Sequence, residues 1–353
     1  MTGRRGGRPR QADIARIAGV SQATVSLVLG GSETALALAP ETRKRVMDAA
    51  RELGYVADPA ARRLVLRNNR LLGVYTFMAT FPVDFRNSYY PFLVGVEEEA
   101  AAQGYDLLLF TGSGGEPDST GLNRLRLADG CVLIGRHAPA DELARLLDDE
   151  FPIVYLGRND SVGTRLPYVG ADYVRASADV VAELAALGHR RVYYVREPDQ
   201  AVASVDREDG FRLGLRETGL RGEVIRTDGG DLGPDRLRAW LAEGATALVV
   251  EATDTQAAAG ALRSAAESAG LGCPGDFSLA MLGEEVYQRP GEPVVTGFAL
   301  PRREMGRRAA RMLIALLSGD RAAGRQELLA CTPVEGSTTA APRAARTAEM
   351  GEL

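Results

Sequence analysis

The sequence contains few of the residues that mark disulfide-bonded, metal-binding or catalytic proteins. Its three cysteines, Cys131, Cys273 and Cys331, lie far apart and form no CxxC pair, so we expect free thiols in a reducing compartment. Its two histidines, His137 and His189, show no metal-ligand spacing. No serine or cysteine has a recognisable base partner in the sequence. These absences predict a protein that is not an enzyme and that needs no cofactor and no metal.

Long apolar runs are also missing. No stretch approaches the roughly 18 consecutive apolar residues that a membrane span needs. The first residues, MTGRRGGRPRQAD, are rich in arginine and contain no apolar core of the kind found in a signal peptide. We therefore expect a cytoplasmic protein with no membrane partner.

The charge is distributed unevenly along the chain. The net charge is −5, but residues 1–70 carry +7 and the remainder carries −12. Lys44 is the only lysine, so arginine supplies nearly all of the positive charge. A basic N-terminal segment followed by an acidic remainder predicts that the N-terminal segment binds a polyanion such as DNA, because each neutralised phosphate releases counterions.

The segment ADIARIAGVSQATVSLVLGG (residues 12–31) predicts two short helices joined by a tight turn. The first helix begins near Ala12, and Gly19 can adopt the left-handed conformation that ends it. The residues expected on its buried face are Ile14, Ile17 and Ala18. This pattern is typical of a helix-turn-helix.

The second helix of this motif would lie in the major groove of DNA. Ser21 is suited to cap its start, and the inward residues would be Val25, Val28 and Leu29. Its outward residues are Gln22, Ala23, Ser26 and Leu27. A third helix is expected from Pro40 to the turn at Gly54.

The segments DIARIAGVSQATVSLVL, PETRKRVMDAARELGY and DPAARRL resemble the N-terminus of the lactose-repressor/galactose-repressor (LacI/GalR) family of bacterial transcription regulators. Further along, VEEEAAAQGYDLLLF, LGHRRVYYV, REDGFRLGL and MGRRAARMLIALL follow in the order of that family. The resemblance implies a helix-turn-helix domain over residues 1–57, a hinge helix and linker over 58–70, an effector-binding and dimerisation core over 71–340, and a flexible tail over 341–353.

The resemblance also assigns residues to DNA contact. In the second helix these are Ser21, Gln22, Ala23, Thr24, Ser26 and Leu27, and in the hinge they are Ala61 and Leu64. Leu64 would be the apolar wedge that enters the minor groove. Leu27 departs from the family, where arginine is common, and leucine cannot make a bidentate contact to guanine. Ala39 stands where the family usually has a serine cap, which predicts a weaker start of the third helix.

The body of the chain alternates predicted strands and helices, which indicates parallel sheets covered on both faces. The predicted strands are 71–78, 106–110, 131–135, 153–157, 191–197, 223–227, 246–252 and 277–283. The predicted helices are 91–103, 139–149, 173–187, 207–218, 234–243, 254–269 and 301–317. By resemblance, this α/β core makes two parallel-sheet subdomains joined by three crossovers, as in periplasmic sugar-binding proteins.

Ligands of such cores bind in the cleft at the carboxyl ends of the strands. The residues that the resemblance places there are Tyr89, Tyr90, Arg158, Arg207, Thr253, Asp254 and Glu284. The five-donor fork of Arg207 suits sugar hydroxyls or a carboxylate. Gly157 and Thr253 replace an aspartate and an asparagine that are frequent in the family, which argues against a simple hexose.

The sequence thus predicts a transcriptional regulator that binds a palindromic operator in double-stranded DNA as a homodimer. Of the two modes of regulation, repression is favoured over activation. A small-molecule effector, a sugar or sugar derivative, would control its affinity. Two alternatives stay open. One is a ligand-promoted repressor or an activator with a non-sugar effector. The other is a small-molecule binding protein without a DNA role.

Overall fold

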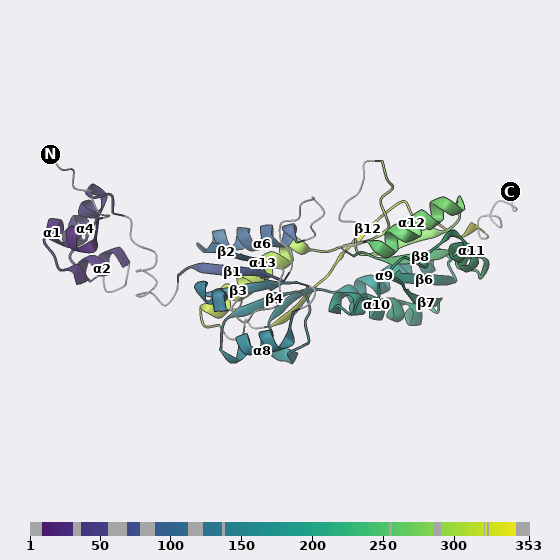
Figure 1. The fold of residues 1–353 in the computed structure, drawn as a ribbon, viewed down its shortest axis with the longest axis horizontal. Helices are drawn as coiled ribbons and strands as arrows, with labels where there is room; N and C mark the ends of the chain where they lie inside the picture. Colours follow the sequence, from purple (N-terminus) through teal and green to yellow (C-terminus); the bar gives the residue numbers. More distant parts are fainter. Residues whose placement is uncertain are drawn as a thin grey trace. The chain divides into compact units, whose positions relative to one another are not determined.

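The computed structural model describes residues 9–30, 37–55, 69–77, 89–111, 123–135, 138–253, 256–284, 291–320, 322 and 325–343. The contacts between residues divide the chain into two compact units, Met1–Arg70 and Leu71–Leu353 (Figure 1). No single helix in these described ranges is long and apolar enough to span a membrane.

Within its described residues, the first unit contains three helices, α1 (Gln11–Ala18), α2 (Gln22–Gly30) and α4 (Pro40–Glu52). The chain bends by 106° between α1 and α2, as expected for a helix-turn-helix. Gly19 makes the turn possible, because it ends α1 in the left-handed conformation with φ 62°. Gly54 has φ 59° after α4, and the turn predicted there is confirmed.

The three helices share a small apolar core. Ile14, Val25 and Val46 are fully buried at its centre. The prediction for α1 was wrong at Ile17, whose side chain is 41 % exposed, and Ala15 is buried in its place. The face that packs inward is the one shared by Ile14, Ala15 and Ala18, where small side chains allow the other helices to approach.

The second unit contains two subdomains, and the N-subdomain consists of residues 71–171 with α13 and β11. Its strands are β1 (Leu71–Thr76), β2 (Asp106–Thr111), β3 (Gly130–Ile134), β4 (Ile153–Leu156), β5 (Tyr168–Ala171) and β11 (Gln326–Leu329). They pair in parallel in the order β11-β5-β4-β3-β1-β2. The helices are α6 (Tyr90–Ala102), α8 (Ala140–Asp148) and α13 (Arg302–Leu317). Helices α6 and α13 cover one face of the sheet, and α8 covers the other.

The C-subdomain consists of residues 173–299 and the segment from β12 to residue 343. Its strands β6 (Arg191–Arg196), β7 (Arg221–Arg226), β8 (Ala247–Glu251) and β9 (Ser278–Leu282) form a parallel sheet in the order β7-β6-β8-β9. Strands β10 (Gly297–Ala299) and β12 (Thr332–Val334) pair in antiparallel fashion. The helices are α9 (Tyr173–Ala186), α10 (Val202–Thr218), α11 (Pro234–Ala242) and α12 (Ala257–Ala269).

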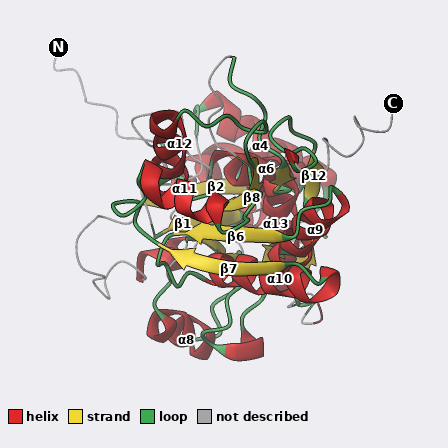
Figure 2. Ribbon diagram, turned by 90° about the vertical axis from the view of Figure 1, so that its right-hand side faces the viewer, coloured by secondary structure: helices red, strands yellow, loops and turns green. Residues whose placement is uncertain are grey.

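Helices cover both faces of this second sheet (Figure 2). Tyr193 and Val195 of β6 pack with α11 and α12, whereas Val192 and Tyr194 of the same strand pack with α9 and α10. Successive side chains of a strand point to opposite faces, so a strand that is apolar throughout is buried on both sides. The predicted α/β core is confirmed.

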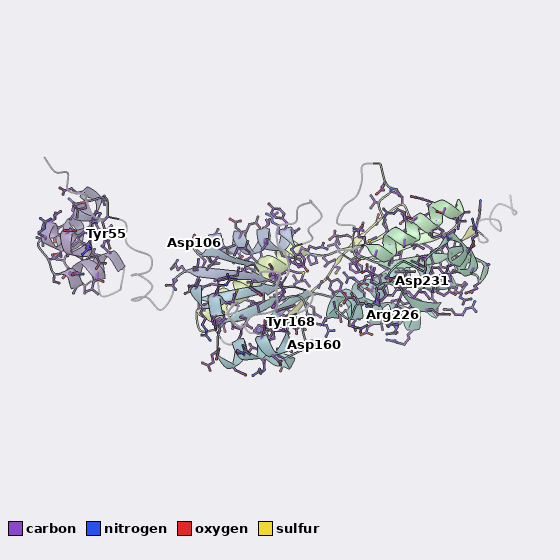
Figure 3. All side chains as sticks on the ribbon, viewed as in Figure 1. Tyr55, Asp106, Asp160, Tyr168, Arg226 and Asp231 are labelled. Carbon is purple, nitrogen blue, oxygen red and sulfur yellow. The ribbon has the colours of Figure 1, made fainter. Side chains whose placement is uncertain are left out.

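In the part of the chain that the structure describes, the backbone passes between the two subdomains three times, between β5 and α9, between β10 and α13, and between β11 and β12. The backbone amide of Asp172 donates to the carbonyl of Leu329 at 2.8 Å, so two of these crossovers touch. The labels of Figure 3 place Asp160 and Tyr168 in the N-subdomain and Arg226 and Asp231 in the C-subdomain. The crossovers hold together two sheets whose carboxyl ends supply residues to one cleft.

His189 lies between α9 and β6 and is 2 % exposed. Its Nδ1 is 2.7 Å from the hydroxyl of Thr246, and its Nε2 is 3.1 Å from the hydroxyl of Ser278. Ser278 in turn donates to the carbonyl of Ala340 at 3.0 Å. His189 therefore supports the attachment of the last described segment to β9.

This burial predicts a dependence of stability on pH. Burial lowers the pKa of His189, so the folded state keeps the ring neutral while the unfolded chain already binds a proton. The free energy of unfolding should therefore fall as the pH drops below about 6.5. We measure the free energy of unfolding in urea between about pH 7.5 and about pH 5.5. It should fall less with decreasing pH for His189→Gln than for the control His137→Gln. Equal slopes would contradict this role.

Candidate nucleic-acid interface and ligand cleft

Helix α2 begins with a side-chain cap. The backbone amide of Thr24 donates to Oγ of Ser21 at 3.1 Å, and the two hydroxyl oxygens are 2.9 Å apart. This hydrogen bond satisfies one of the backbone donors at the start of the helix. The predicted cap is confirmed, and it orients the first turn of α2.

The outward face of α2 carries most of the residues assigned to DNA. Gln22, Ala23 and Leu27 are exposed, Leu27 at 36 %, whereas Thr24 and Ser26 are half-buried. Val25 points the other way and is fully buried. Ala61 and Leu64 of the predicted hinge lie outside the described residues. The described face is therefore polar with one exposed leucine, and it is presented by a helix whose opposite side is fixed in a core.

The cleft of the second unit is lined by residues that follow the strands of both sheets. Arg158 follows β4, Thr253 follows β8, and Glu284 follows β9. Tyr89 precedes α6, and Arg207 lies on α10. The structure thus brings together five of the seven predicted ligand residues at the carboxyl ends of parallel strands.

Of the other two predicted residues, one lies away from the cleft and the other is not described. Tyr90 begins α6 with its side chain 65 % exposed, and it is not among the residues that line the cleft. Asp254 lies outside the described residues. The sequence also missed several lining residues, among them Asp206, Arg302 and Tyr173. Helix α10 begins at Val202 rather than at residue 207, and this earlier start places Asp206 beside Arg207 on the helix.

An ion pair joins the subdomains across the cleft. Nε of Arg158, in the N-subdomain, donates to Oδ2 of Asp206, in the C-subdomain, at 2.9 Å. A second hydrogen bond runs from the same guanidinium to Oδ1, which makes the pair bidentate. The hydrogen bond to Asp206 raises the pKa of Arg158 above its ordinary value, so the guanidinium stays charged. Asp160 also accepts a hydrogen bond from Arg158.

A second ion pair joins the subdomains where the chain returns into α13. Arg302, at the start of this helix, pairs with Glu284, which follows β9. The carboxylate of Glu284 also accepts from the backbone amide of Leu300 at 3.3 Å. Glu284 is thus paired with Arg302, and within the described residues no ion pair joins it to the predicted cleft residue Arg207.

Arg207 is deeply buried, with only 5 % of the residue exposed. Its Cζ lies 4.1 Å from the centre of the Tyr173 ring, which is the geometry of a cation–π contact. Its Nη1 donates to the carbonyl of Ala203 at 3.2 Å and is 3.6 Å from Oε1 of Glu251. Its Nε has no hydrogen-bond partner among the described residues. Glu251, at the end of β8, is a counter-charge that the sequence pattern did not reveal.

The remaining wall of the cleft offers few polar side chains. The hydroxyl of Thr253 donates to Oε1 of Glu197 at 2.7 Å and accepts from the backbone amide of Gln256 at 2.9 Å. These hydrogen bonds hold the backbone at the start of α12. Gly157 has φ 113°, where a side chain would be strained, and it exposes main chain to the cleft. Burial raises the pKa of Tyr155 to about 12, so this phenol stays a neutral donor.

Nothing in the described part of the chain groups three or more histidine, cysteine, aspartate or glutamate side chains in a way that could hold a metal ion. The chemistry of the cleft is therefore that of arginines, engaged carboxylates and aromatic walls. Such an arrangement binds a small polar molecule through charge-assisted hydrogen bonds and ring contacts.

Two family models match the chain. Residues 12–58 match the model of bacterial regulatory proteins of the lacI family, and residues 181–339 match the periplasmic binding protein-like domain. The first match covers α1, α2 and α4, and the second covers most of the C-subdomain. Both matches agree with the folds described above.

Several regulators are similar over most of their length. An HTH-type transcriptional regulator from Streptomyces limosus is 33 % identical over 325 residues, which is 87 % of each chain. The regulator GntR from Pseudomonas aeruginosa is 31 % identical over 326 residues, 89 % of this chain and 90 % of the relative. CelR from Thermobifida fusca is 29 % identical over 324 residues, 89 % of this chain and 93 % of the relative.

Solved structures support the same fold. The Lac repressor dimer bound to operator and an anti-inducer matches with a TM-score of 0.71 and 21 % identity, covering 95 % of this chain and all of that one. A CelR–cellobiose complex matches with a TM-score of 0.61 and 24 % identity, covering 94 % of this chain and all of the other. Together with the regulators above 30 % identity, these matches show that the chain belongs to the lacI family of bacterial regulatory proteins and is a DNA-binding transcriptional regulator.

Proposed function

We propose that the protein is a repressor that binds a palindromic operator as a homodimer in the cytoplasm, and that a sugar or sugar derivative in the cleft controls its affinity. The observation that carries this proposal is the cleft between the subdomains, where the buried Arg207 has an Nε without a partner among the described residues. The proposal is one of binding rather than catalysis, because the relatives are named as regulators.

The first unit supports the DNA-binding part of the proposal. It carries a net charge of +7, whereas the rest of the chain carries −12, and it presents the exposed face of α2 (Gln22–Gly30). A recognition helix of this kind reads only one half-site, and two copies on a palindrome gain affinity because the second contact is intramolecular. The Lac repressor structure named above is a dimer on its operator, which supports the same assembly here.

The two ion pairs across the cleft support control by a ligand. Arg158 and Asp206 come from different subdomains, as do Arg302 and Glu284, and all four residues line the cleft. A molecule that binds among them contacts both subdomains, so its affinity depends on how far the cleft is closed. Such a ligand shifts the equilibrium between conformations and thereby the spacing of the DNA-binding units in a dimer.

The test is a titration with the full-length protein. An operator is first selected from random duplex DNA, and its affinity is then measured with neutral sugars, sugar acids, sugar phosphates and nucleosides. Weaker operator binding with a sugar derivative supports the proposal, whereas tighter binding would identify a ligand-promoted regulator. Failure to select any sequence, or the absence of an effect of every compound, would contradict it.

A substitution at Leu27 tests the orientation of α2. Leu27→Arg adds a two-pronged donor for O6 and N7 of guanine, so one symmetric base of each half-site should shift toward guanine by about 1–3 kcal/mol. Met47→Arg is the control, because it adds the same charge on α4, where Met47 is 41 % exposed. Selection from a random library should change the motif for the first variant only. Identical motifs for wild type and Leu27→Arg would show that Leu27 does not face the bases.

A substitution at Arg207 tests the cleft. Arg207→Ala should leave operator affinity unchanged and abolish the response to whichever panel compound acts on the wild type, because Arg207 lies in the second unit. Arg238→Ala, in an exposed pair with Asp235 on α11, should respond like the wild type. A folded Arg207→Ala protein with an unchanged midpoint of response would place the effector elsewhere.

A further inference from the structure

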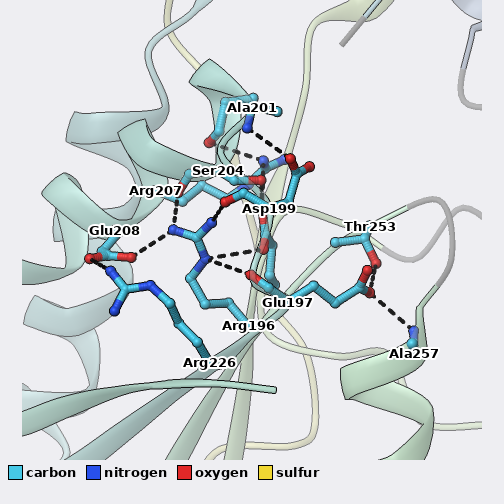
Figure 4. Close-up of polar contacts among 12 residues, drawn as sticks. Arg196, Glu197, Asp199, Ala201, Ser204, Arg207, Glu208, Arg226, Thr253 and Ala257 are labelled. Atoms are coloured by element: carbon cyan, nitrogen blue, oxygen red, sulfur yellow. Dashed lines mark hydrogen bonds and ion pairs between the residues drawn. The ribbon is translucent and has the colours of Figure 1, made fainter. Parts of the chain in front are cut away.

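A single buried carboxylate on α10 holds three arginines together outside the cleft (Figure 4). Glu208 is 3 % exposed, and its Oε2 accepts from Nη1 of Arg196 at 2.6 Å. Its Oε1 forms ion pairs with Nη2 of Arg212 and with Nη2 of Arg226. We call these four side chains the outer charge cluster. None of them is among the residues that line the described cleft.

The fold itself brings these like charges together. Arg196 ends β6 and Arg226 ends β7, and the register of the two parallel strands places them directly opposite one another. Like charges in that position destabilise a sheet unless an anion lies between them. Glu208 supplies this anion from α10, where Arg212 follows it by four residues. Glu251 lies 3.7 Å from Nε of Arg196 and pairs with neither Arg212 nor Arg226.

The described carboxylates leave the two outer arginines with an excess of positive charge. For Arg226, Glu208 is the one carboxylate within ion-pair distance in the part of the chain that the structure describes. Arg212 has a second one, because its Nη1 lies 3.8 Å from Asp209. The side chain of Asp209 is 56 % exposed, so solvent screens this pair. Arg212 and Arg226 therefore depend mainly on one oxygen of Glu208, which also serves Arg196.

The two outer guanidinium groups are accessible from solvent. The side chains of Arg212 and Arg226 are 48 % and 43 % exposed, whereas that of Glu208 is 4 % exposed. Arg226 lies on β7, the edge strand of its sheet. A guanidinium group has five N–H donors, and the ion pairs with Glu208 each involve one Nη2 atom. The shared oxygen fixes the two groups near one another, and such preorganisation lowers the entropic cost of binding a ligand.

The charge of this pair favours one class of ligand. Three arginines around Glu208 leave an excess of two positive charges within the outer charge cluster. A phosphate group carries a charge of about −1.5 to −2 at pH 7, and its terminal oxygens can accept from two guanidinium forks. A carboxylate brings only one negative charge, and a sugar hydroxyl brings none. The excess charge is therefore matched best by a phosphate group.

We propose that Arg212 and Arg226 form a phosphate-binding site on the outer side of α10 and β7. The ligand is free phosphate or a small phosphorylated molecule, and both present the same group to the two guanidinium forks. Glu208 is the positioning residue, because it holds both arginines from beneath. This second site is separate from the proposed effector site and goes beyond the proposed function of the cleft.

The test is a titration of the full-length protein by calorimetry at constant ionic strength. The ligands are inorganic phosphate, methyl phosphate and glucose 6-phosphate, with acetate as the singly charged control. Inorganic phosphate should bind about tenfold or more tightly than acetate. Equal affinities for phosphate and its esters would identify the phosphate group alone as the ligand. Tighter binding of glucose 6-phosphate would identify a phosphorylated metabolite.

Variants locate the site. Arg226→Gln and Arg212→Gln should each weaken phosphate binding about tenfold, and Arg226→Lys, which keeps the charge without the fork, should retain part of the affinity. All three should fold, because the replaced side chains are half-exposed and Glu208 keeps Arg196 as a partner. Arg238→Gln on α11, where the arginine is 53 % exposed, is the matched control and should bind phosphate like the wild type.

Several results would overturn this proposal. They are acetate binding as tightly as phosphate, unchanged phosphate affinity in both Arg212→Gln and Arg226→Gln, or binding of a glutamate-rich peptide in place of phosphate. Loss of phosphate binding in Arg207→Gln, with full binding in Arg226→Gln, would place the phosphate in the cleft instead. Each of these results leaves the proposed function standing, because that function is tested by the response of operator binding to sugars.

Discussion

Gly306→Ala should destabilise the second unit by about 3 kcal/mol or more, since overpacking against main chain forces the backbone to move. Gly306 lies on α13 where this helix crosses α6 (Tyr90–Ala102). A Cβ at this position would lie 2.2 Å from the carbonyl oxygen of Phe92 and 3.0 Å from the amide nitrogen of Val96. Gly95 makes the reciprocal contact, where a Cβ would lie 1.9 Å from the carbonyl oxygen of Arg303. The two glycines allow the helices to touch backbone to backbone.

Gly260→Ala is the matched control for this prediction. Gly260 lies exposed on α12, and a Cβ there would meet no atom within 4 Å. Alanine should therefore stabilise that helix by about 0.5–1 kcal/mol, as helix propensity predicts. Urea unfolding followed by circular dichroism should move the two midpoints in opposite directions. A Gly306→Ala protein as stable as the wild type would show that the helices are not in main-chain contact.

Arg196→Met should cost about 3–5 kcal/mol of stability, the effect expected when one partner of a buried ion pair is removed. Arg196 is 1 % exposed and holds Glu208 at 2.6 Å on one side and Glu251 at 3.7 Å on the other. It also donates to the carbonyls of Glu197 and Asp199. Methionine fills much of the volume of the Arg196 side chain, but it removes the positive charge that compensates the two buried carboxylates.

The comparison variant is Arg238→Met on α11. Arg238 pairs with Asp235 at 3.2 Å, but the two side chains are 53 % and 98 % exposed, so its loss should cost less than about 1 kcal/mol. Arg196→Lys should recover part of the loss, because it restores the charge without the several donors of a guanidinium. The melting temperatures of the three variants are measured by calorimetry. Equal melting temperatures for Arg196→Met and Arg238→Met would refute the stabilising role assigned to Arg196.

The sequence by itself determined the local features of this protein. Gly19 marks the end of α1, Ser21 the start of α2, and Pro40 and Gly54 the two ends of α4, because turns and caps depend on neighbours in the chain. The longer strands and helices of the core were also predictable, since alternating apolar segments bounded by turns carry a strong periodic signal. The family followed from the order of these motifs.

The short strands were decided by tertiary structure. Strands β5, β10, β11 and β12 have only three or four residues, and none of them was predicted. Strand β11 is a strand because it pairs with β5, in a register that joins Gln326 to Tyr168. The hydrogen-bond partners of such a strand lie far away in the sequence, so its own residues do not reveal it.

The partners within the cleft were likewise decided by tertiary structure. The pattern indicated Arg158, Arg207 and Glu284, but it did not indicate that Arg158 pairs with Asp206, Arg302 with Glu284, or Glu251 with Arg207. The exposure of Tyr90 and Ile17 could not be predicted either. Residue type sets what a side chain can bind, whereas its actual partner depends on which segments the fold brings within a few ångströms, and most of these segments are distant in sequence.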